Sequence, residues 1–170
     1  METGKIVMVL IFIVLVYYAY KDLRPFFIRK KRLKDYSKDE ITTITDKLNN
    51  ELCLKYNVPK PKWGLSDLSK GDFGYGSNPE DIDGAYVIEI RTILIDLDGI
   101  ISRYDRLEDY IASFIHEFAH YMDHLELESK GLDYSEYYTK RTQFYEDRAN
   151  ELMTKLTHKI YHKYLSNGEV

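Results

Sequence analysis

Several features that would point to particular protein classes are scarce in this chain of 170 residues. It has one cysteine, Cys53, which excludes an intramolecular disulfide and any site built on a CxxC pair. Its formal net charge of −4 argues against a general nucleic-acid-binding protein. Hydrophobic residues make up 44% and charged residues 31%, which excludes both a disordered tail and a chain lying wholly in a membrane. The length fits one compact domain with an appendage.

Charge is unevenly distributed along the chain. Residues 1–40 contain nine Lys and Arg against five Asp and Glu, whereas residues 41–170 contain fifteen against twenty-three. The basic part holds an unbroken apolar run at residues 6–20, which spans roughly 22 Å as a helix. We predict a membrane anchor with a basic juxtamembrane segment at residues 1–36 and a separate domain at residues 37–170.

The orientation of this anchor follows from the charges beside it. Lys21, Arg24 and five more basic residues between positions 29 and 34 follow the run, whereas only Lys5 precedes it. The positive-inside rule then predicts a single-pass protein, N-out and C-in, with a cytoplasmic domain. The basic residues either contact anionic lipid head groups or are simply solvated. The alternative is a secretory signal peptide and an extracytoplasmic domain, although no small-x-small cleavage site follows the run.

Hydrophobic periodicity predicts a small α+β domain after the anchor. Ser37 and Glu40 match a capping box before an amphipathic helix at residues 38–56. A short strand is expected around residues 63–68, followed by two strands, or one long bent strand, within residues 84–97.

Two long helices complete the predicted domain. The Asp98–Gly99 pair is expected to end the strands, and Asp105 to cap a helix that runs to about Leu127. The last helix is expected to start at Asp133 or Ser135 and to run to about residue 165.

Residues 116–120 read His-Glu-Phe-Ala-His within the first of these long helices. Residues four apart share a helix face, so His116 and His120 can reach one metal ion. Glu117 then lies near any water at that metal, where it can act as the general base of an HExxH zinc hydrolase. Chance alone gives this pattern in roughly one such sequence in a hundred. The alternative is an ordinary amphipathic helix with two exposed histidines.

A catalytic zinc site also needs a third protein ligand and one open position. Glu146, one helix downstream, is the first candidate, and Ala149 would let that helix approach closely. Asn150 lies on the same helix face as Glu146 and could hydrogen-bond a metal-binding histidine. Glu151 points about 100° further round the helix and is expected to be a solvated surface acid.

Other residues of metal-binding type are weaker candidates. His124 lies about 12 Å along the helix axis from His116, too far to share one ion. Cys53 falls in a predicted amphipathic helix, where its side chain is expected to be buried and to serve packing only. His158 and His162 have no glutamate beside them, and we expect both to face solvent.

The HExxH pattern followed by Glu-x-x-Ala-Asn at residues 146–150 resembles the gluzincin metallopeptidases, especially the compact ImmA/IrrE-like proteins of bacteria, phages and mobile elements. The likeness covers roughly residues 41–163, and its specific part is residues 84–153. It implies a zincin-like domain, built of a helix, a short β-sheet, the HExxH helix and a helix with the Glu ligand. It also implies one zinc ion held by His116, His120 and Glu146, with Glu117 catalytic and Asn150 supporting the site. The helix-turn-helix module of some relatives is not visible here.

These observations favour a membrane-anchored zinc endopeptidase that acts on a cytoplasmic protein or peptide and binds no nucleic acid. The alternatives are a metal hydrolase with a non-peptide substrate and a catalytically idle binding or adaptor protein of the same fold. Two histidines and a glutamate favour zinc over manganese or cobalt. The substrate is expected to add as a strand near residues 93–97, unless that segment is sheet core. The oxyanion needs a donor, for which five tyrosines are near enough in sequence: Tyr121, Tyr134, Tyr137, Tyr138 and Tyr145.

Overall fold

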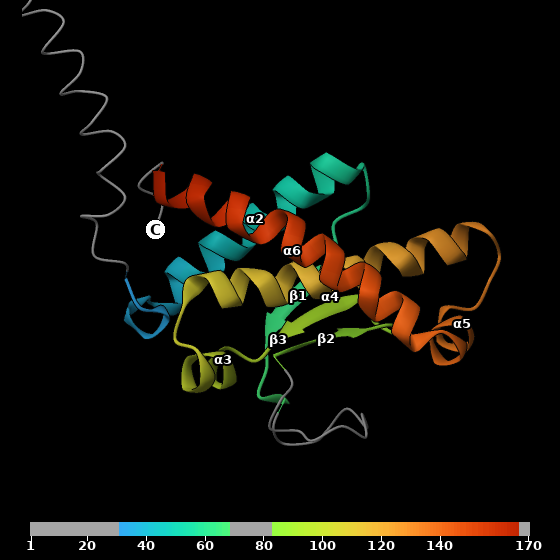
Figure 1. Cartoon of the computed structure of the whole chain (residues 1–170), viewed down its shortest axis with the longest axis horizontal. Helices are drawn as coiled ribbons and strands as arrows, with labels where there is room; N and C mark the ends of the chain where they lie inside the picture. The colour runs from blue at the N-terminus through green and yellow to red at the C-terminus, as the bar shows by residue number, and fades with distance from the viewer. Residues whose placement is uncertain (1–30, 69–82, 167–170) are drawn as a thin grey trace, which may run out of the picture.

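The computed structural model describes residues 31–68 and 83–166, which form an α+β domain of helices around a small sheet (Figure 1). The apolar run predicted to anchor the protein, residues 6–20, lies outside the described residues. Among the residues that are described, no helix has the length and apolar character needed to span a bilayer.

The first long helix forms where the sequence predicts it. After a short 3₁₀ turn, η1 (Leu33–Asp35), helix α2 (Lys38–Tyr56) begins with the predicted capping box. The Ser37 hydroxyl accepts the Glu40 N–H, and the Glu40 carboxylate accepts the Ser37 N–H. The helix ends at Asn57, whose left-handed backbone (φ 53°) forms the C-cap.

Three short strands form one sheet in the order β1-β3-β2. Strand β1 (Lys62–Leu65) pairs parallel with β3 (Thr92–Ile95), and β2 (Gly84–Val87) pairs antiparallel with β3. The expectation that a substrate strand adds near residues 93–97 is therefore wrong. Strand β3 has a partner on both edges, and its side chains at 93 and 95 are fully buried.

The segment after β3 also departs from the prediction. Asp98–Gly99 does not break the chain, because the Asp96 carboxylate accepts the Gly99 N–H and starts helix α3 (Leu97–Arg103). Helix α4 (Leu107–Ser129) follows, with Arg106 at its N-cap. Asp105 does not cap it, since its carboxylate accepts the Lys34 N–H and the Arg32 guanidinium instead.

The predicted last helix is two helices. Gly131 adopts φ 69° after α4, and Asp133 then caps helix α5 (Tyr134–Lys140) by accepting the Glu136 N–H. The chain turns at Arg141 before helix α6 (Thr142–Ser166). The break places Tyr134 and Tyr138 on α5, and Glu146 and Asn150 on α6.

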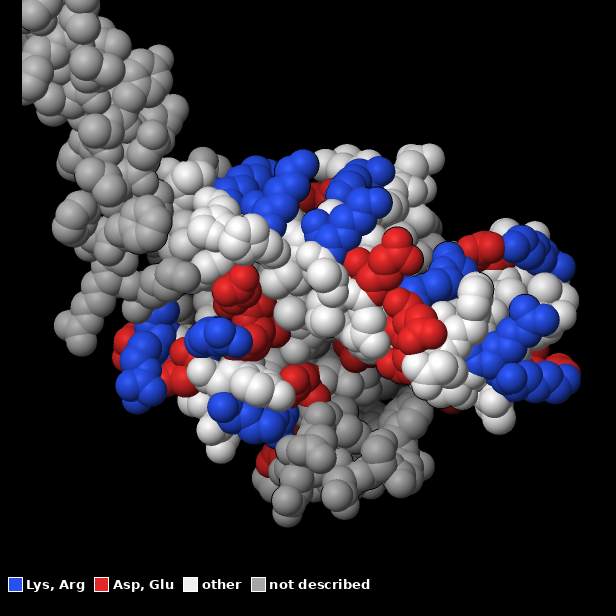
Figure 2. Space-filling view, viewed as in Figure 1, with Lys and Arg blue, Asp and Glu red and all other residues white. Residues whose placement is uncertain are grey.

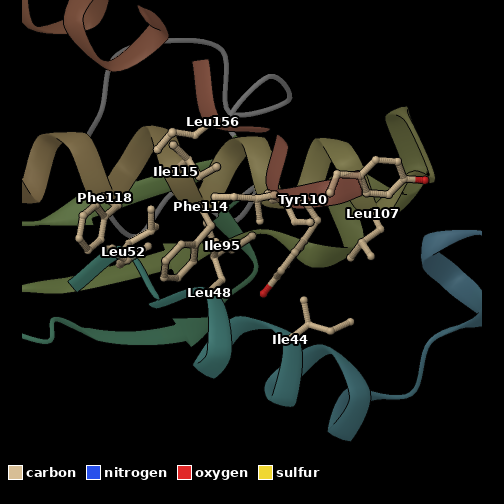
Figure 3. Packing of buried hydrophobic residues seen from close by; sticks show 14 of the residues in the cluster. Ile44, Leu48, Leu52, Ile95, Leu107, Tyr110, Phe114, Ile115, Phe118 and Leu156 are labelled. Atoms are coloured by element: carbon tan, nitrogen blue, oxygen red, sulfur yellow. The ribbon is translucent and has the colours of Figure 1, made fainter. Parts of the chain in front are cut away.

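Helix α4 lies at the centre of the domain, between α2 and the sheet on one side and α6 on the other (Figures 1 and 3). Phe114 and Phe118 of α4 meet Leu48 and Leu52 of α2 in one hydrophobic cluster, which Leu156 of α6 joins. All five side chains are at most 3% exposed. The motif helix is therefore held rigidly by its apolar faces, which leaves its polar face to form a site.

Candidate metal centre

Helices α4 and α6 bring the three predicted metal-binding side chains together. Nε2 of His116 lies 3.1 Å from Nε2 of His120, one turn along α4. The Glu146 carboxylate of α6 reaches both rings, with Oε2 3.3 Å from His116 Nε2 and Oε1 3.4 Å from His120 Nε2. Ala149, fully buried, allows the two helices to approach as expected.

These distances can be tested against the needs of a metal ion. A tetrahedral zinc site with bonds of 2.0–2.1 Å separates its ligand atoms by about 3.3 Å. The three separations between the His116, His120 and Glu146 ligand atoms lie close to this value. The three residues could therefore hold a metal ion, and together they leave one tetrahedral position open.

Glu117 lies beside this triangle and is buried, with 8% of its surface exposed. Burial raises the pKa of its carboxyl group, while the imidazoles of His120 and His116 act in the opposite direction. The backbone N–H of Tyr86 in β2 also donates to the carboxylate. Glu117 is thus a carboxylate held at the motif with its proton affinity increased, which suits a general base.

Gly84 at the start of β2 makes room for Glu117, and the sequence interpretation missed it. A Cβ atom at residue 84 would lie 2.8 Å from Cγ of Glu117 and 3.1 Å from Cδ1 of Ile95. The glycine is therefore required by a close approach between strand and helix. The glycine at the first position of a predicted strand could have indicated this close approach.

Further polar groups orient the two imidazoles. The side chain of Asn150 hydrogen-bonds His116, as predicted from its position four residues after Glu146. The hydroxyl of Tyr134 lies 3.3 Å from Nδ1 of His120. Such contacts hold the ring planes and select the nitrogen that faces the centre of the triangle.

The acid–base balance within the triangle favours an ionised carboxylate. Hydrogen bonds with His116 and His120 hold the pKa of Glu146 well below its usual range. Burial lowers the pKa of His116, but its hydrogen bond with Glu146 and the nearby charges outweigh this effect and leave the pKa raised. A carboxylate that stays ionised is the form that binds a cation.

Only some of the five candidate tyrosines lie at the cavity. Tyr134 and Tyr138 line the cavity at the motif, and the Tyr138 hydroxyl donates to Oε1 of Glu146. Tyr121 instead donates to the carbonyl of Pro59, 2.9 Å away. Tyr145 is buried and stacks on Tyr138, with ring centroids 6.0 Å apart, and neither it nor Tyr137 lines the cavity.

The cavity has a volume of about 450 Å³ and opens beside β2. Strand β2 and the flanking residues Asp83 and Ile88 form one wall, and α4, α5 and α6 form the rest. No Lys or Arg lines it within residues 31–68 and 83–166, and Asp83 is paired with Arg103. Its charge comes mainly from Glu117 and Glu146.

The weaker metal-ligand candidates lie elsewhere, as expected. Nδ1 of His124 is 2.7 Å from the Tyr86 hydroxyl, Cys53 is half-buried with its thiol toward Asn49, and Glu151 is exposed. His158 and His162 are exposed on α6, with ring centroids 4.1 Å apart.

One buried acid near the site was not anticipated. Asp123 is 3% exposed, and its Oδ1 is 3.0 Å from the Arg148 guanidinium while Oδ2 has no hydrogen-bond partner. Burial raises its pKa to about 6 against the opposing effect of Arg148. The sequence did not indicate this burial, because an acidic residue three positions after His120 is ordinarily expected to face solvent.

Comparison of the chain with protein-family models, curated proteins and solved structures finds no match, so the functional assignment rests on the geometry of this centre.

Proposed function

We propose that the protein is a zinc-dependent endopeptidase in which His116, His120 and Glu146 bind the metal and Glu117 is the general base. The observation that carries the proposal is the triangle of ligand atoms, 3.1 to 3.4 Å apart, with a buried glutamate next to it in the sequence. A metal-binding adaptor would need the triangle but has no use for that glutamate.

The residues of the chain have distinct parts in this hydrolysis. When bound, zinc polarises a carbonyl group and lowers the pKa of a water molecule toward about 7. The Glu117 carboxylate accepts the proton of the attacking water and passes it to the leaving amine. Burial, by raising the pKa of Glu117, makes this carboxylate a better proton acceptor near neutral pH.

Tyr138 is the proposed donor to the oxyanion. Its hydroxyl lies in the cavity and donates to Glu146, which it would exchange for the oxyanion, whereas the Tyr134 hydroxyl lies at Nδ1 of His120, across the ring from the ligand atom Nε2. A hydroxyl held at the metal-binding carboxylate is close to where negative charge develops on a carbonyl oxygen. Asn150 and Tyr134 keep the two imidazoles in position.

The position of the cavity beside an edge strand favours an extended peptide as substrate. Of the described strands, β2 lies at a sheet edge and also lines the cavity, so a peptide could pair with it and pass the metal centre. This replaces the segment near residues 93–97 as the proposed docking strand. With zinc bound, the charge of the ion balances the carboxylates of Glu117 and Glu146, so the described wall of the cavity selects for neither basic nor acidic peptide segments.

Membrane anchoring is part of the proposal. Residues 6–20 are the proposed single span, and the basic residues after it support a cytoplasmic catalytic domain. Protease added outside intact cells should leave the domain undigested. Digestion of the domain from outside would place it on the other side of the membrane.

Two substitutions test the catalytic proposal. Glu117→Gln should keep one zinc per chain and lose peptide cleavage, and Glu146→Ala should lose both. Glu151→Gln is the matched control, since this exposed glutamate of α6 lies outside the cavity at residue 146. Substrates are found by comparing the cleaved proteins of the native host carrying wild type or Glu117→Gln. Full biological activity of Glu117→Gln with zinc bound would show that the protein is not a peptidase.

A further inference from the structure

The half of α6 that follows Glu151 carries charge of a single sign. Residues 152–166 contain no Asp or Glu. Lys155, Lys159 and Lys163 recur every fourth residue, so they form one stripe along the helix, and all three are exposed. Figure 2 shows Lys and Arg side chains gathered over this part of α6 and the adjoining part of α2.

Contacts with α2 extend this stripe into a wider surface. Lys163 pairs with Glu51 of α2 at 2.8 Å, and Lys47 of α2 lies over the Tyr164 ring, 5.4 Å from its centroid. Long side chains of the two helices therefore meet here. We define the basic face as Lys47, Lys55, Lys155, Lys159 and Lys163.

A large apolar side chain of α2 borders this basic face, on the side of the helix that Lys47 occupies two turns earlier. Leu54 is 84% exposed, more than any other large hydrophobic residue among the described parts of the chain. It lies next to Lys55 and one helical turn from Glu51, the partner of Lys163. An exposed leucine at the border of a basic face is costly in water, but it matches the boundary between lipid head groups and acyl chains.

We propose that the basic face binds the surface of an anionic phospholipid bilayer, with Leu54 inserted between the head groups. The charge complementarity is local, because residues 41–170 as a whole carry eight more acidic than basic residues. A membrane with negative surface potential attracts such a face and repels the rest of the domain. An acidic protein would match the lysines equally well, but it accepts Leu54 only where it has a fitting apolar pocket, whereas every bilayer has an apolar layer beneath its head groups.

The chain length is consistent with this surface. Ten residues, 21–30, separate the predicted span from the first described residue, and they can extend at most about 35 Å. A domain on such a tether stays near the bilayer, so weak contacts of the basic face act at high local concentration. The proposal does not depend on the zinc chemistry.

The test places a probe at Leu54 in the full chain. Leu54→Cys, in a Cys53→Ser background, is labelled with an environment-sensitive fluorophore and mixed with phosphatidylcholine vesicles with or without phosphatidylglycerol. The fluorophore should shift to the blue and be quenched by spin-labelled lipid when phosphatidylglycerol is present. Replacing Lys155, Lys159 and Lys163 by Gln should weaken this docking on the order of a hundredfold, at about fivefold per lysine.

The controls separate the basic face from the rest of the molecule. Replacing Lys130, Lys140 and Arg141 by Gln removes the same charge elsewhere and should leave docking unchanged, and so should Glu117→Gln. A label at Ile90, 55% exposed in the turn between β2 and β3, should not be quenched. The proposal is wrong if Leu54 is not quenched, if it is quenched equally without phosphatidylglycerol, or if both triple variants lose docking alike. Binding of the labelled face to an acidic protein in place of vesicles would also overturn it.

Discussion

Substituting Gly84 by Ala tests how closely the proposed catalysis depends on the packing of β2 against the motif helix. The added Cβ would lie 2.8 Å from Cγ of Glu117, about 0.6 Å inside the shortest ordinary contact between carbon atoms. Ile95, 3.1 Å away on the other side, is fully buried and has little room to move. The Glu117 side chain must therefore shift, while the metal-binding residues are not touched.

The size of the effect follows from this displacement. A misplacement of about 1 Å at a catalytic group costs on the order of a hundredfold in rate, so we expect kcat to fall between about tenfold and a hundredfold. The crowding should also destabilise the fold by about 1–3 kcal/mol. Zinc content should stay at one ion per chain.

The matched control is Gly64→Ala in β1 of the same sheet. A Cβ there meets only Cδ2 of Leu94 at 3.7 Å, an ordinary contact. Its kcat should match that of wild type, and its stability should be unchanged or higher by up to about 1 kcal/mol. Peptide cleavage, zinc analysis and urea unfolding of both variants decide the matter. If Gly84→Ala cleaves as fast as Gly64→Ala, Glu117 is not held by the strand as described.

Two further predictions concern side chains at and behind the metal centre. Tyr138→Phe should keep zinc and lower kcat by about 10²-fold or more, because it removes a donor to the oxyanion; Tyr145→Phe, which alters the stacked ring outside the cavity, should leave kcat unchanged. An equal kcat for both variants would exclude Tyr138 as the donor. Asp123 has a pKa raised to about 6, so the folded state binds its proton more tightly than the unfolded state. Its contribution to the free energy of unfolding is therefore lost as pH rises from about 4 to about 6, by about 3 kcal/mol at most. Asp123→Asn should lack this loss in urea unfolding of the zinc-free protein, and parallel pH profiles for the two proteins would contradict the shift.

The sequence predicted those elements whose determinants are local. The capping box at Ser37 and the buried stripe of α2 depend on residues within two turns, and both were correct. The triangle at His116, His120 and Glu146 was also anticipated, because the spacing on one helix brings the two histidines together and an alanine three residues after Glu146 permits close packing.

The remaining features depend on contacts between distant segments. The Asp98–Gly99 pair is typical of residues that end a strand, yet these residues begin α3 because the carboxylate of Asp96 accepts the Gly99 N–H. No glycine or proline marks the break at Arg141, which lets the Tyr138 hydroxyl fold back onto Glu146, eight residues later. The position of β3 between its two partners also has no local cause, so the edge beside the cavity could not be identified in advance.

The two faces of α6 have a consequence for where substrates come from. Glu146 and Asn150 point into the cavity, whereas Lys155, Lys159 and Lys163 lie about 120–160° round the same helix, at about 100° per residue. If the lysine side rests on a bilayer, the side of α6 that lines the cavity is turned away from it. Bonds inside the membrane or at its surface are then out of reach. A peptidase anchored as proposed would meet soluble proteins, or membrane-protein segments that extend beyond the thickness of its own domain.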